Sequence, residues 1–463
     1  MLYVSVVLYQ NIGTDEAMHR PIIRGLIAVA VATAGSLALA GVASAASAVP
    51  AVSAAPRVPA LSLSGGRAFA SPHGGTIIFR ARLSAASRSV VTVHFATRNG
   101  TAVAGKDYVP VSGTLRFPPG SLRRSVTVTL RPTALGAGGV VKEFSVVLSR
   151  PVRATLSTHA ATGTILPDVY VASSGDAFQD AVINPASTTA FLTVPAMNQV
   201  DVLNLRTGTF SRPIPVGSDP IGLDITPDGK TLYVCDAGGQ TISKVNLATR
   251  RVTTITTPAG FLSPRPYSIA VMNNGHALFT TTFSGSGFGG TAYDLNLSSN
   301  AIKVVPGIGI NGQVTEATPL SRSAGYSTVG AVLGDDSGGP FDVYTAATGH
   351  VTSGSLNDFI SSSALNGNGS VMLVDGIYVI NAVSGTLLGT ISGQRGNSVV
   401  NATGTTGYRL AGSSIVSLNI PRFLTGPTIS LPEPASGGAE LAMSKNGRVL
   451  VAETSGGATI IQL

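Results

Sequence analysis

Few residues of this chain have side chains that could act as nucleophiles, proton carriers or metal ligands. The single cysteine, Cys235, follows the apolar residues 232–234, and of six histidines only His276 and His350 lie within residues 168–463. Both histidines stand beside glycine in turn-like segments, and no H-x-x-x-H spacing could hold a metal on one helix face. We therefore expect Cys235 to be a small buried residue, both histidines to be solvated, and the chain to carry no metal or cofactor.

One short string looks catalytic. Residues 334–340 (GDDSGGP) contain D-S-G-G-P, which resembles the segment around the nucleophile of trypsin-like proteases. That chemistry needs a histidine within hydrogen-bond distance of the serine and an acid that orients it. No Ala-Ala-His-Cys-like segment precedes the string, and Asp, Ser, Gly and Pro are the residues that form turns. We predict a turn here, not a protease site.

The composition indicates short strands joined by tight turns. Only 11% of the 463 residues are charged, 55 are glycine and none is tryptophan. β-Branched residues fit a pleated sheet, glycine supplies the positive φ of tight turns, and the helix-forming residues Glu, Lys and Gln are scarce. We predict an all-β protein of two or three domains, without an internal disulfide.

The N-terminal segment has the parts of a secretory signal peptide. Basic residues precede an apolar run over 26–42, and Ala43–Ser44–Ala45 forms a small-x-small cleavage site. Because two acids precede the basic residues, we expect translation to begin at Met18. We interpret 1–45 as a signal peptide, with a permanent signal anchor as the alternative, and 46–59 as an Ala/Pro linker. The mature protein would be secreted, with no transmembrane segment after cleavage.

Residues 60–167 alternate apolar and polar residues in about seven short runs, which predicts an immunoglobulin-like β-sandwich. Residues 97–108 (TRNGTAVAGKDY) resemble the Calx-β signature T-x-x-G-T-A-x-x-G-x-D-Y. Two later segments, 144–151 (FSVVLSRP) and 163–165 (GTI), follow in the order found in that family. The resemblance implies a Calx-β sandwich.

Calx-β domains are known to bind Ca²⁺ through clustered carboxylates, and Ca²⁺ takes about six to eight oxygen ligands. Here the pattern departs from the family. Between residues 61 and 153 the only acids are Asp107 and Glu143, and Lys142 stands where family members often have glutamate. We expect no calcium site and interpret Asp107 as a turn-capping residue.

The positive charge gathers in the predicted sandwich. Residues 49–166 hold fourteen lysines and arginines against two acids, a balance of +12, whereas 167–463 hold fourteen against eighteen, a balance of −4. A dense positive field attracts polyanions in a salt-dependent way. We predict a polyanion-binding surface formed by Arg67, Arg80, Arg82, Arg116, Arg123, Arg124 and Arg131, with a merely solvated surface as the alternative. We expect no nucleic-acid partner, since no aromatic residues interleave with the arginines.

Residues 168–463 repeat with a period of about 43 residues, within the range of propeller blades. Turn signals recur at 186–188, 227–229, 273–275, 323–325, 367–369, 403–405 and 445–447, and most precede an apolar strand. A strand pair cannot bury both of its faces alone, so the repeats must stack around an axis. We predict a β-propeller of about seven blades, closed by residues 169–172 pairing with the last strands.

Residues 216–234 (VGSDPIGLDITPDGKTLYV) resemble one unit of the YVTN family of propeller repeats, with Cys235 and Asp236 replacing the Thr and Asn of the signature. Some propellers of this kind resemble lactonases, which open a sugar lactone with acids and His or Arg in the central channel. The resemblance thus implies an alternative function, an extracellular lactonase or lyase. The few acids in the fourth to sixth blades leave little choice of general base.

The preferred interpretation is a secreted, monomeric, non-enzymatic binding or adhesion protein associated with the cell surface. The propeller would be the ligand-binding platform and the basic sandwich a spacer. We expect its partner to be an anionic cell-wall polymer, a polysaccharide or another surface protein. A channel lined by Ser, Thr and Gly would favour binding, and three or more acids, His or Arg converging at one end would favour the enzyme.

Overall fold

The computed structural model describes residues 58–133, 140–174, 176–259, 265–283, 288–334, 336–435 and 439–463. Apart from two short 3-10 helices, Pro195–Met197 and Ala237–Gly239, every regular element there is a β-strand, which confirms the all-β prediction. No helix of this part of the chain is long and apolar enough to cross a bilayer. The predicted signal peptide, residues 1–45, lies outside the described residues.

Strands from residues 60–166 form the two sheets of a β-sandwich. The four-stranded sheet has the order β6 (Arg123–Leu130), β3 (Gly75–Leu83), β1 (Ala60–Ser64) and β8 (Thr155–Leu156). The five-stranded sheet has the order β2 (Gly66–Phe69), β9 (Ala160–Leu166), β7 (Lys142–Val152), β4 (Val91–Asn99) and β5 (Ser112–Phe117). Burial alternates along β3 and β6, so one face of this sheet packs into the core and the other meets solvent.

Aromatic rings fill the centre of the sandwich. Tyr108 and Phe144 stack with ring centroids 4.3 Å apart, and Phe79 meets Phe144 edge to face. Gly163 on β9 is required by this packing, because a Cβ there would lie 2.7 Å from both phenylalanine rings. The hydroxyl of Tyr108 donates a hydrogen bond to Asn99 Oδ1 at 2.7 Å, which satisfies the polar end of this buried side chain.

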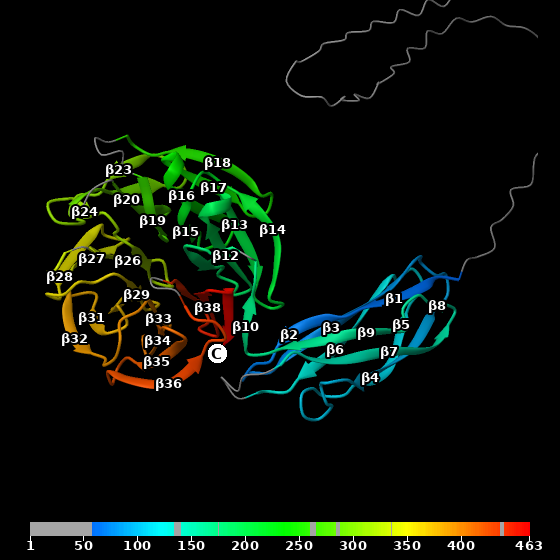
Figure 1. Ribbon diagram of the computed structural model, residues 1–463. Helices are drawn as coiled ribbons and strands as arrows, with labels where there is room; N and C mark the ends of the chain where they lie inside the picture. The colour runs from blue at the N-terminus through cyan, green and yellow to red at the C-terminus, as the bar shows by residue number, and fades with distance from the viewer. Residues whose placement is uncertain are drawn as a thin grey trace, which may run out of the picture. The chain divides into compact units, whose positions relative to one another are not determined.

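The described residues from Val169 onward form seven four-stranded antiparallel sheets arranged in a ring (Figure 1). The first sheet contains β11 (Ala181–Ile183), β12 (Thr189–Val194), β13 (Gln199–Asn204) and β14 (Thr209–Pro215). The second contains β15 (Pro220–Ile225), β16 (Thr231–Asp236), β17 (Thr241–Asn246) and β18 (Arg251–Thr256). The third contains β19 (Arg265–Val271), β20 (His276–Thr282), β22 (Ala292–Asn296) and β23 (Ile302–Val304). A small extra pair, β21 (Phe288–Gly290) and β24 (Val314–Thr315), lies outside this series.

The remaining four sheets complete the ring. They are β25 (Leu320–Arg322), β26 (Thr328–Val332), β27 (Pro340–Thr345), β28 (His350–Ser355); β29 (Ser363–Leu365), β30 (Val371–Val374), β31 (Tyr378–Asn381), β32 (Thr386–Thr390); β33 (Ser398–Val400), β34 (Thr406–Ala411), β35 (Ser414–Asn419), β36 (Leu424–Ser430); and β37 (Leu441–Met443), β38 (Val449–Thr454), β39 (Gly457–Gln462), β10 (Val169–Ala172). We refer to them as blades 1 to 7 in this order, beginning with the sheet of β11.

Each predicted turn signal falls in the hairpin between the first two strands of a blade. Gly229, for example, has φ +70° between β15 and β16, a conformation that glycine adopts without steric cost. The ring closes as predicted: β10 pairs antiparallel with β39, with Val169 opposite Ile461. The last blade is thereby built from both ends of the propeller sequence, which covers two sheet edges.

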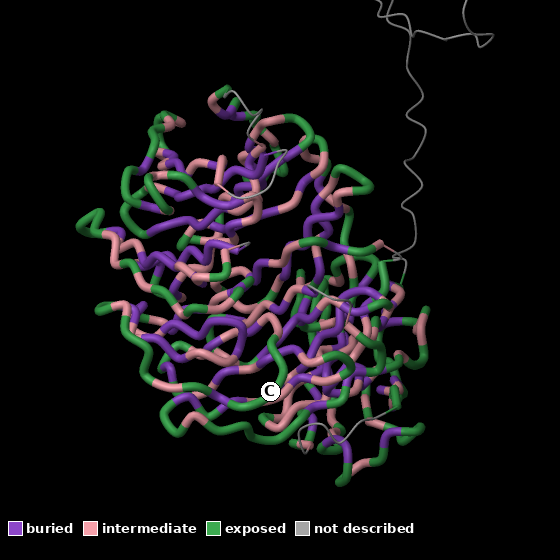
Figure 2. Tube along the Cα trace, turned by 60° about the vertical axis from the view of Figure 1, so that its left-hand side comes forward, coloured by how far each residue is buried: buried purple, intermediate pink, exposed green. Residues whose placement is uncertain are grey.

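Apolar clusters join neighbouring blades all round the ring. One cluster, for instance, combines Phe191 and Val200 of blade 1 with Leu223, Leu232 and Val234 of blade 2. Figure 2 shows buried residues along the strands and exposed ones in the connecting loops. Each blade therefore buries its faces against the next blade, and the innermost strands are left to face the axis.

Candidate functional site

The innermost strands of the blades line a cavity of about 800 Å³. Backbone and side chains from β11, β15, β19, β25, β29, β33 and β37 all contribute to it, so it is the central channel of the propeller. Seven serines belong to its lining: Ser268, Ser321, Ser361, Ser362, Ser363, Ser398 and Ser444. The charged side chains of the lining are Asp180, Asp224, Asp375, Glu440, Arg322, Arg395 and Lys445.

Asp224 and Arg322 form an ion pair in the channel wall. Nε of Arg322 donates to Oδ2 of Asp224 at 2.6 Å, and the guanidinium lies 3.8 Å from the ring centroid of Tyr326. The same Oδ2 accepts from the backbone N–H of Val271 at 2.7 Å, and Oδ1 accepts from the N–H of Ile225 at 2.8 Å. The carboxylate thus links blades 2, 3 and 4 through three hydrogen bonds.

Two further carboxyl groups of the channel have raised pKa values. Burial and the nearby charge of Asp224 raise the pKa of Asp180 to about 6. Hydrogen bonds from the backbone N–H groups of Leu223 and Ala181 lower this pKa but do not offset the increase. Burial raises the pKa of Glu440 well above its ordinary value, and the charges of Asp180 and Glu453 add to this effect. Carboxyl groups of blades 7, 1 and 2 therefore repel one another along one side of the channel.

Polar side chains of the inner strands mostly tie one blade to the next. Oδ2 of Asp180 in blade 1 accepts from the Leu223 N–H of blade 2 at 2.9 Å, and the hydroxyls of Ser321 and Ser363 join blades 4 and 5 at 2.8 Å. Asp375 Oδ1 accepts from the backbone and hydroxyl groups of both Ser361 and Ser362. The channel therefore combines a hydroxyl lining with carboxylates that hold the ring together.

These channel residues escaped the sequence analysis. Asp180, Asp224, Arg322 and Glu440 are widely separated in the chain, and only closure of the ring brings them together. A signal was available, because each stands a few residues before one of the seven turn signals, where the innermost strand must lie.

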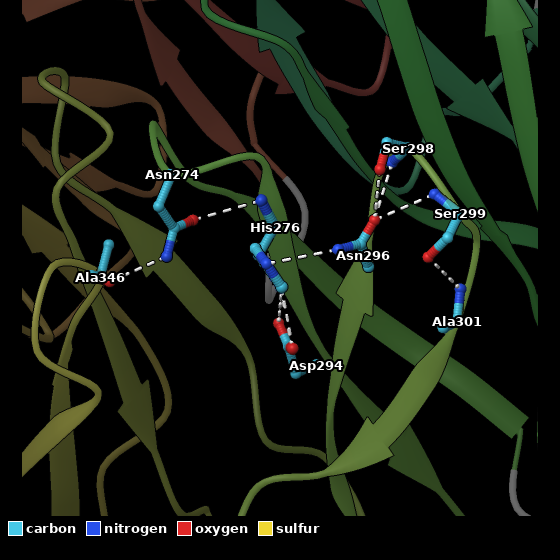
Figure 3. Close-up of polar contacts among 8 residues, drawn as sticks. All are labelled: Asn274, His276, Asp294, Asn296, Ser298, Ser299, Ala301 and Ala346. Carbon is cyan, nitrogen blue, oxygen red and sulfur yellow. Dashed lines mark hydrogen bonds and ion pairs between the residues drawn. The ribbon is translucent and has the colours of Figure 1, made fainter.

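The prediction that His276 is solvated is wrong. It is the first residue of β20, and its Nδ1 lies 2.9 Å from both carboxylate oxygens of Asp294 on β22 (Figure 3). Nε2 meets the side-chain amide of Asn296 at 3.5 Å, and Asn274 bonds both to the His276 N–H and to the Ala346 carbonyl. Hairpin pairing of β20 and β22 places the ring beside the acid. No serine or threonine hydroxyl of the described residues bonds to this imidazole.

The other candidate residues lie as follows. His350 begins β28 and is exposed. Cys235 is completely buried, and burial raises the pKa of its thiol well above the ordinary value, which confirms it as an apolar core residue. The D-S-G-G-P string, residues 336–340, lies at the turn between β26 and β27, where the N–H of Gly338 donates to the Asp336 carboxylate at 2.6 Å. Asp335, just before the string, lies outside the described residues.

The seven arginines of the predicted polyanion surface do not share one face of the sandwich. Arg80, Arg82 and Arg123 do, because Arg82 stands opposite Arg123, and Arg80 opposite Ser125, on the exposed face of the four-stranded sheet. Arg116 lies on β5 and Arg67 on β2, both in the other sheet.

The last two arginines lie near the ends of β6. Arg131 follows this strand directly and is exposed. Arg123 and Arg124 are the first two residues of β6. The guanidinium of Arg124 donates to two backbone carbonyls. Nε donates to the Arg116 carbonyl at 2.8 Å, and Nη1 donates to the Arg123 carbonyl at 3.0 Å.

The sandwich residues do not fit a calcium ion. Asp107 Oδ2 accepts from the Val103 N–H at 2.8 Å, as expected of a turn-capping residue, while Oδ1 lies 2.7 Å from Nζ of Lys142. Burial alone would raise the pKa of Asp107, but bonds from Lys142 and Val103 hold it below its ordinary value. The only other acid of this region, Glu143, follows Lys142 on β7 and is exposed. An ammonium group already neutralises the one buried carboxylate that a dication could use.

Comparison with known proteins separates the two parts of the chain. The Calx-beta domain family matches residues 70–169. Hydrazine synthase of Kuenenia stuttgartiensis is similar in structure, with a TM-score of 0.50, 14% identity, and coverage of 62% of this chain and 96% of that one. U3-55K has a TM-score of 0.50 at 15% identity and covers 64% of this chain and 98% of its own. No curated protein matches the sequence.

At these identities the structural neighbours show the fold alone. The family match covers the sandwich strands from β3 onward, and the structural neighbours support the propeller that follows. The chain is thus composed of a Calx-β sandwich followed by a β-propeller.

Proposed function

We propose that this protein is a secreted, non-enzymatic binding or adhesion protein whose propeller holds a polar, hydroxyl-bearing ligand in its channel. The observation that carries this proposal is the cavity of about 800 Å³ with seven serines in its lining. Its volume lies within the range of small-molecule sites, about 300–1,000 Å³. Serine hydroxyls both donate and accept, so they suit the hydroxyl groups of a saccharide.

Binding is favoured over catalysis by the state of the carboxylates. A general base needs a free lone pair directed at its substrate. The oxygens of Asp224 accept hydrogen bonds from two backbone N–H groups and from Arg322. One oxygen of Asp375 accepts four hydrogen bonds. Both oxygens of Asp180 accept from backbone N–H groups. These hydrogen bonds commit the carboxylates to stabilising the ring and shaping the channel.

The sandwich would serve as a basic spacer that holds the protein near anionic surface polymers. Arg82 and Arg123 stand directly opposite each other, and like charges in such a pair are destabilising. An anionic polymer lying across this face would relieve the repulsion. Export through the N-terminal signal and a YVTN-type repeat in blade 2 are parts of the same proposal, and both rest on the sequence.

A pull-down with purified cell-wall material and polysaccharides tests the proposal. Binding to the sandwich should disappear at about 0.5 M salt, because the Debye length falls from about 10 Å at 0.1 M to about 3 Å at 1 M. Binding in the channel depends on short hydrogen bonds and should survive. Retention of a polysaccharide at high salt supports the proposal, and release of every bound polymer contradicts the role given to the propeller.

A second function, that of a lactonase or lyase, is favoured by one observation. Asp180 has a pKa raised to about 6, and Glu440 beside it is also raised, which are properties of acid–base groups. If this function holds, the protein should open a sugar lactone and Asp180→Asn should abolish turnover. Turnover that is unchanged in Asp180→Asn, or absent in both proteins, excludes Asp180 as a catalytic residue.

A further inference from the structure

One large aromatic side chain of the propeller is exposed to solvent. Phe359 is 58% exposed, and among the described residues it is the only phenylalanine or tyrosine that is neither buried nor half-buried. It also belongs to the lining of the channel cavity, so a molecule in that cavity can contact its ring. Single exposed apolar residues are common on protein surfaces, so the place and the support of this one decide whether it has a role.

Phe359 lies at one mouth of the channel. It stands in the segment 356–362, which connects the outermost strand of blade 4, β28, to the innermost strand of blade 5, β29. Because the blades repeat by rotation about the axis, their innermost strands run in the same direction, and the residues that precede these strands lie at the same mouth. Asp180, Arg395 and Glu440 precede β11, β33 and β37 and line the same cavity. A ligand at this mouth therefore meets the phenyl ring of Phe359.

Polar and charged groups hold the backbone at Phe359 from one side. Nη1 of Arg395 donates to the Phe359 carbonyl, and Nη2 donates to the carboxylate of the preceding residue, Asp358. The hydroxyl of Tyr378 on β31 donates to the same carboxylate. Arg395 belongs to the connection between blades 5 and 6, so two parts of the ring outside the segment itself hold it in place.

Buried contacts hold the segment on the other side of Phe359. Ile360 is 2% exposed and packs in an apolar cluster that includes Phe341 of blade 4. The N–H and the hydroxyl of Ser361 both donate to Oδ1 of Asp375 at 3.0 Å. Because the residues on both sides are held, the backbone that carries the exposed ring is already ordered, and contact with a ligand costs little further ordering of the chain.

We propose that Phe359 is a stacking platform at the channel mouth, on which the ring of a pyranoside lies, so that the ligand is a cyclic saccharide and not an open-chain polyol. A pyranose with equatorial hydroxyls presents a face of C–H groups, which suits the apolar face of an aromatic ring. Its hydroxyls lie at the ring edge and remain available to the serines of the lining. The inference rests on the proposed function, since it names the class of ligand in that channel.

Fluorescence gives a direct test, because the chain has no tryptophan. Phe359→Trp in the full-length protein places a single indole at the platform, and Val383→Trp places one at a residue that is 72% exposed and outside the cavity lining. The probes are methyl β-glucoside, which has a ring face, and glucitol, an open-chain polyol with more hydroxyls. We expect methyl β-glucoside to shift the emission of Phe359→Trp to shorter wavelength and to reduce its quenching by acrylamide. Glucitol with this variant, and either probe with Val383→Trp, should leave the emission unchanged.

Calorimetric titration measures what the phenyl ring itself contributes. We expect the wild type to bind methyl β-glucoside about tenfold more tightly than glucitol and Phe359→Ala to lose this difference, since aromatic stacking changes affinity by about that factor. Phe359→Tyr keeps the aromatic face and should retain the preference. Because Phe359 is exposed, its variants should unfold at a Tm close to that of the wild type, which separates lost stacking from lost folding.

The outcomes separate the two proposals. Binding of methyl β-glucoside that Phe359→Ala leaves unchanged, or that does not alter the emission of Phe359→Trp, overturns the platform while the channel remains a saccharide site. Equal affinity of the wild type for methyl β-glucoside and glucitol also overturns it, because hydroxyl groups alone would then account for recognition. Absence of binding by both probes overturns the platform and counts against the ligand class proposed for the channel.

Discussion

Replacing Lys142 by methionine would remove the ammonium that neutralises Asp107 while keeping most of the side-chain volume. Nζ of Lys142 lies 2.7 Å from Oδ1 of Asp107, whose side chain is 8% exposed, whereas that of Lys142 is 34% exposed. A hydrogen bond to a charged group contributes about 1.5–3 kcal/mol when buried. Because the lysine is partly solvated, we expect a smaller loss, about 1–2 kcal/mol. Lys106→Met is the matched control, since Lys106 is exposed in the same turn.

Hydrogen exchange is suited to this test, because the chain has no tryptophan to report unfolding. Protection of the amides around Val103, whose N–H binds Asp107, should fall about five- to thirtyfold in Lys142→Met. It should fall much less in Lys106→Met, because the charge of Lys106 is the smallest of the effects that lower the pKa of Asp107. The size of this loss should depend on pH. The pKa of Asp107 is lowered in the folded protein, so the pair stabilises the fold above the unfolded pKa of about 3.9.

The contribution of the pair is lost as pH falls through the lower, folded pKa of Asp107. Exchange corrected for its intrinsic rate should therefore differ strongly between Lys142→Met and wild type at pH 7, and the difference should shrink below about pH 4. Equal protection in Lys142→Met and Lys106→Met at pH 7, or a difference that stays constant to the lowest pH, would refute the role of Lys142.

Three further predictions concern calcium, polyanions and export. Millimolar Ca²⁺ should leave the Tm of the full-length protein unchanged. If a site existed, Ca²⁺ at about a hundred times its Kd would add about 2.7 kcal/mol to the free energy of unfolding. A rise in Tm that a chelator reverses would show a calcium site. Charge reversal at Arg80, Arg82 and Arg123 should weaken low-salt binding to anionic polymers, while reversal at Arg251 of the propeller should not; equal effects would indicate a merely solvated surface. N-terminal sequencing of secreted protein should begin near Ala46 or Val49, and intact protein in the membrane pellet would show an anchor instead.

The blade hairpins could be predicted because their determinants are local. Turn residues such as those at 227–229 and 445–447 set the chain reversals, and apolar strands follow them directly. Closure by 169–172 followed from the need to cover an edge strand. The Calx-β segment was likewise recognisable from a continuous stretch of sequence, residues 97–108.

The channel could not be predicted in this way, because its chemistry depends on distant residues. Asp224 and Arg322 are separated by 98 positions and meet only when blades 2 to 4 stack. The pairing of Lys142 with Asp107, 35 positions apart, likewise depends on the sandwich fold. His276 was misplaced because the glycine before it suggested a turn, whereas the strand begins at the histidine itself.

The central claim, that the channel is the ligand site, is tested most directly by obstructing it. Ala402 is an exposed turn residue that lines the cavity, and Ala248 is an exposed turn residue that does not. We predict that Ala402→Trp abolishes the calorimetric binding of saccharide at high salt, while Ala248→Trp binds like wild type. Undiminished binding by Ala402→Trp would place the ligand outside the channel and contradict the account.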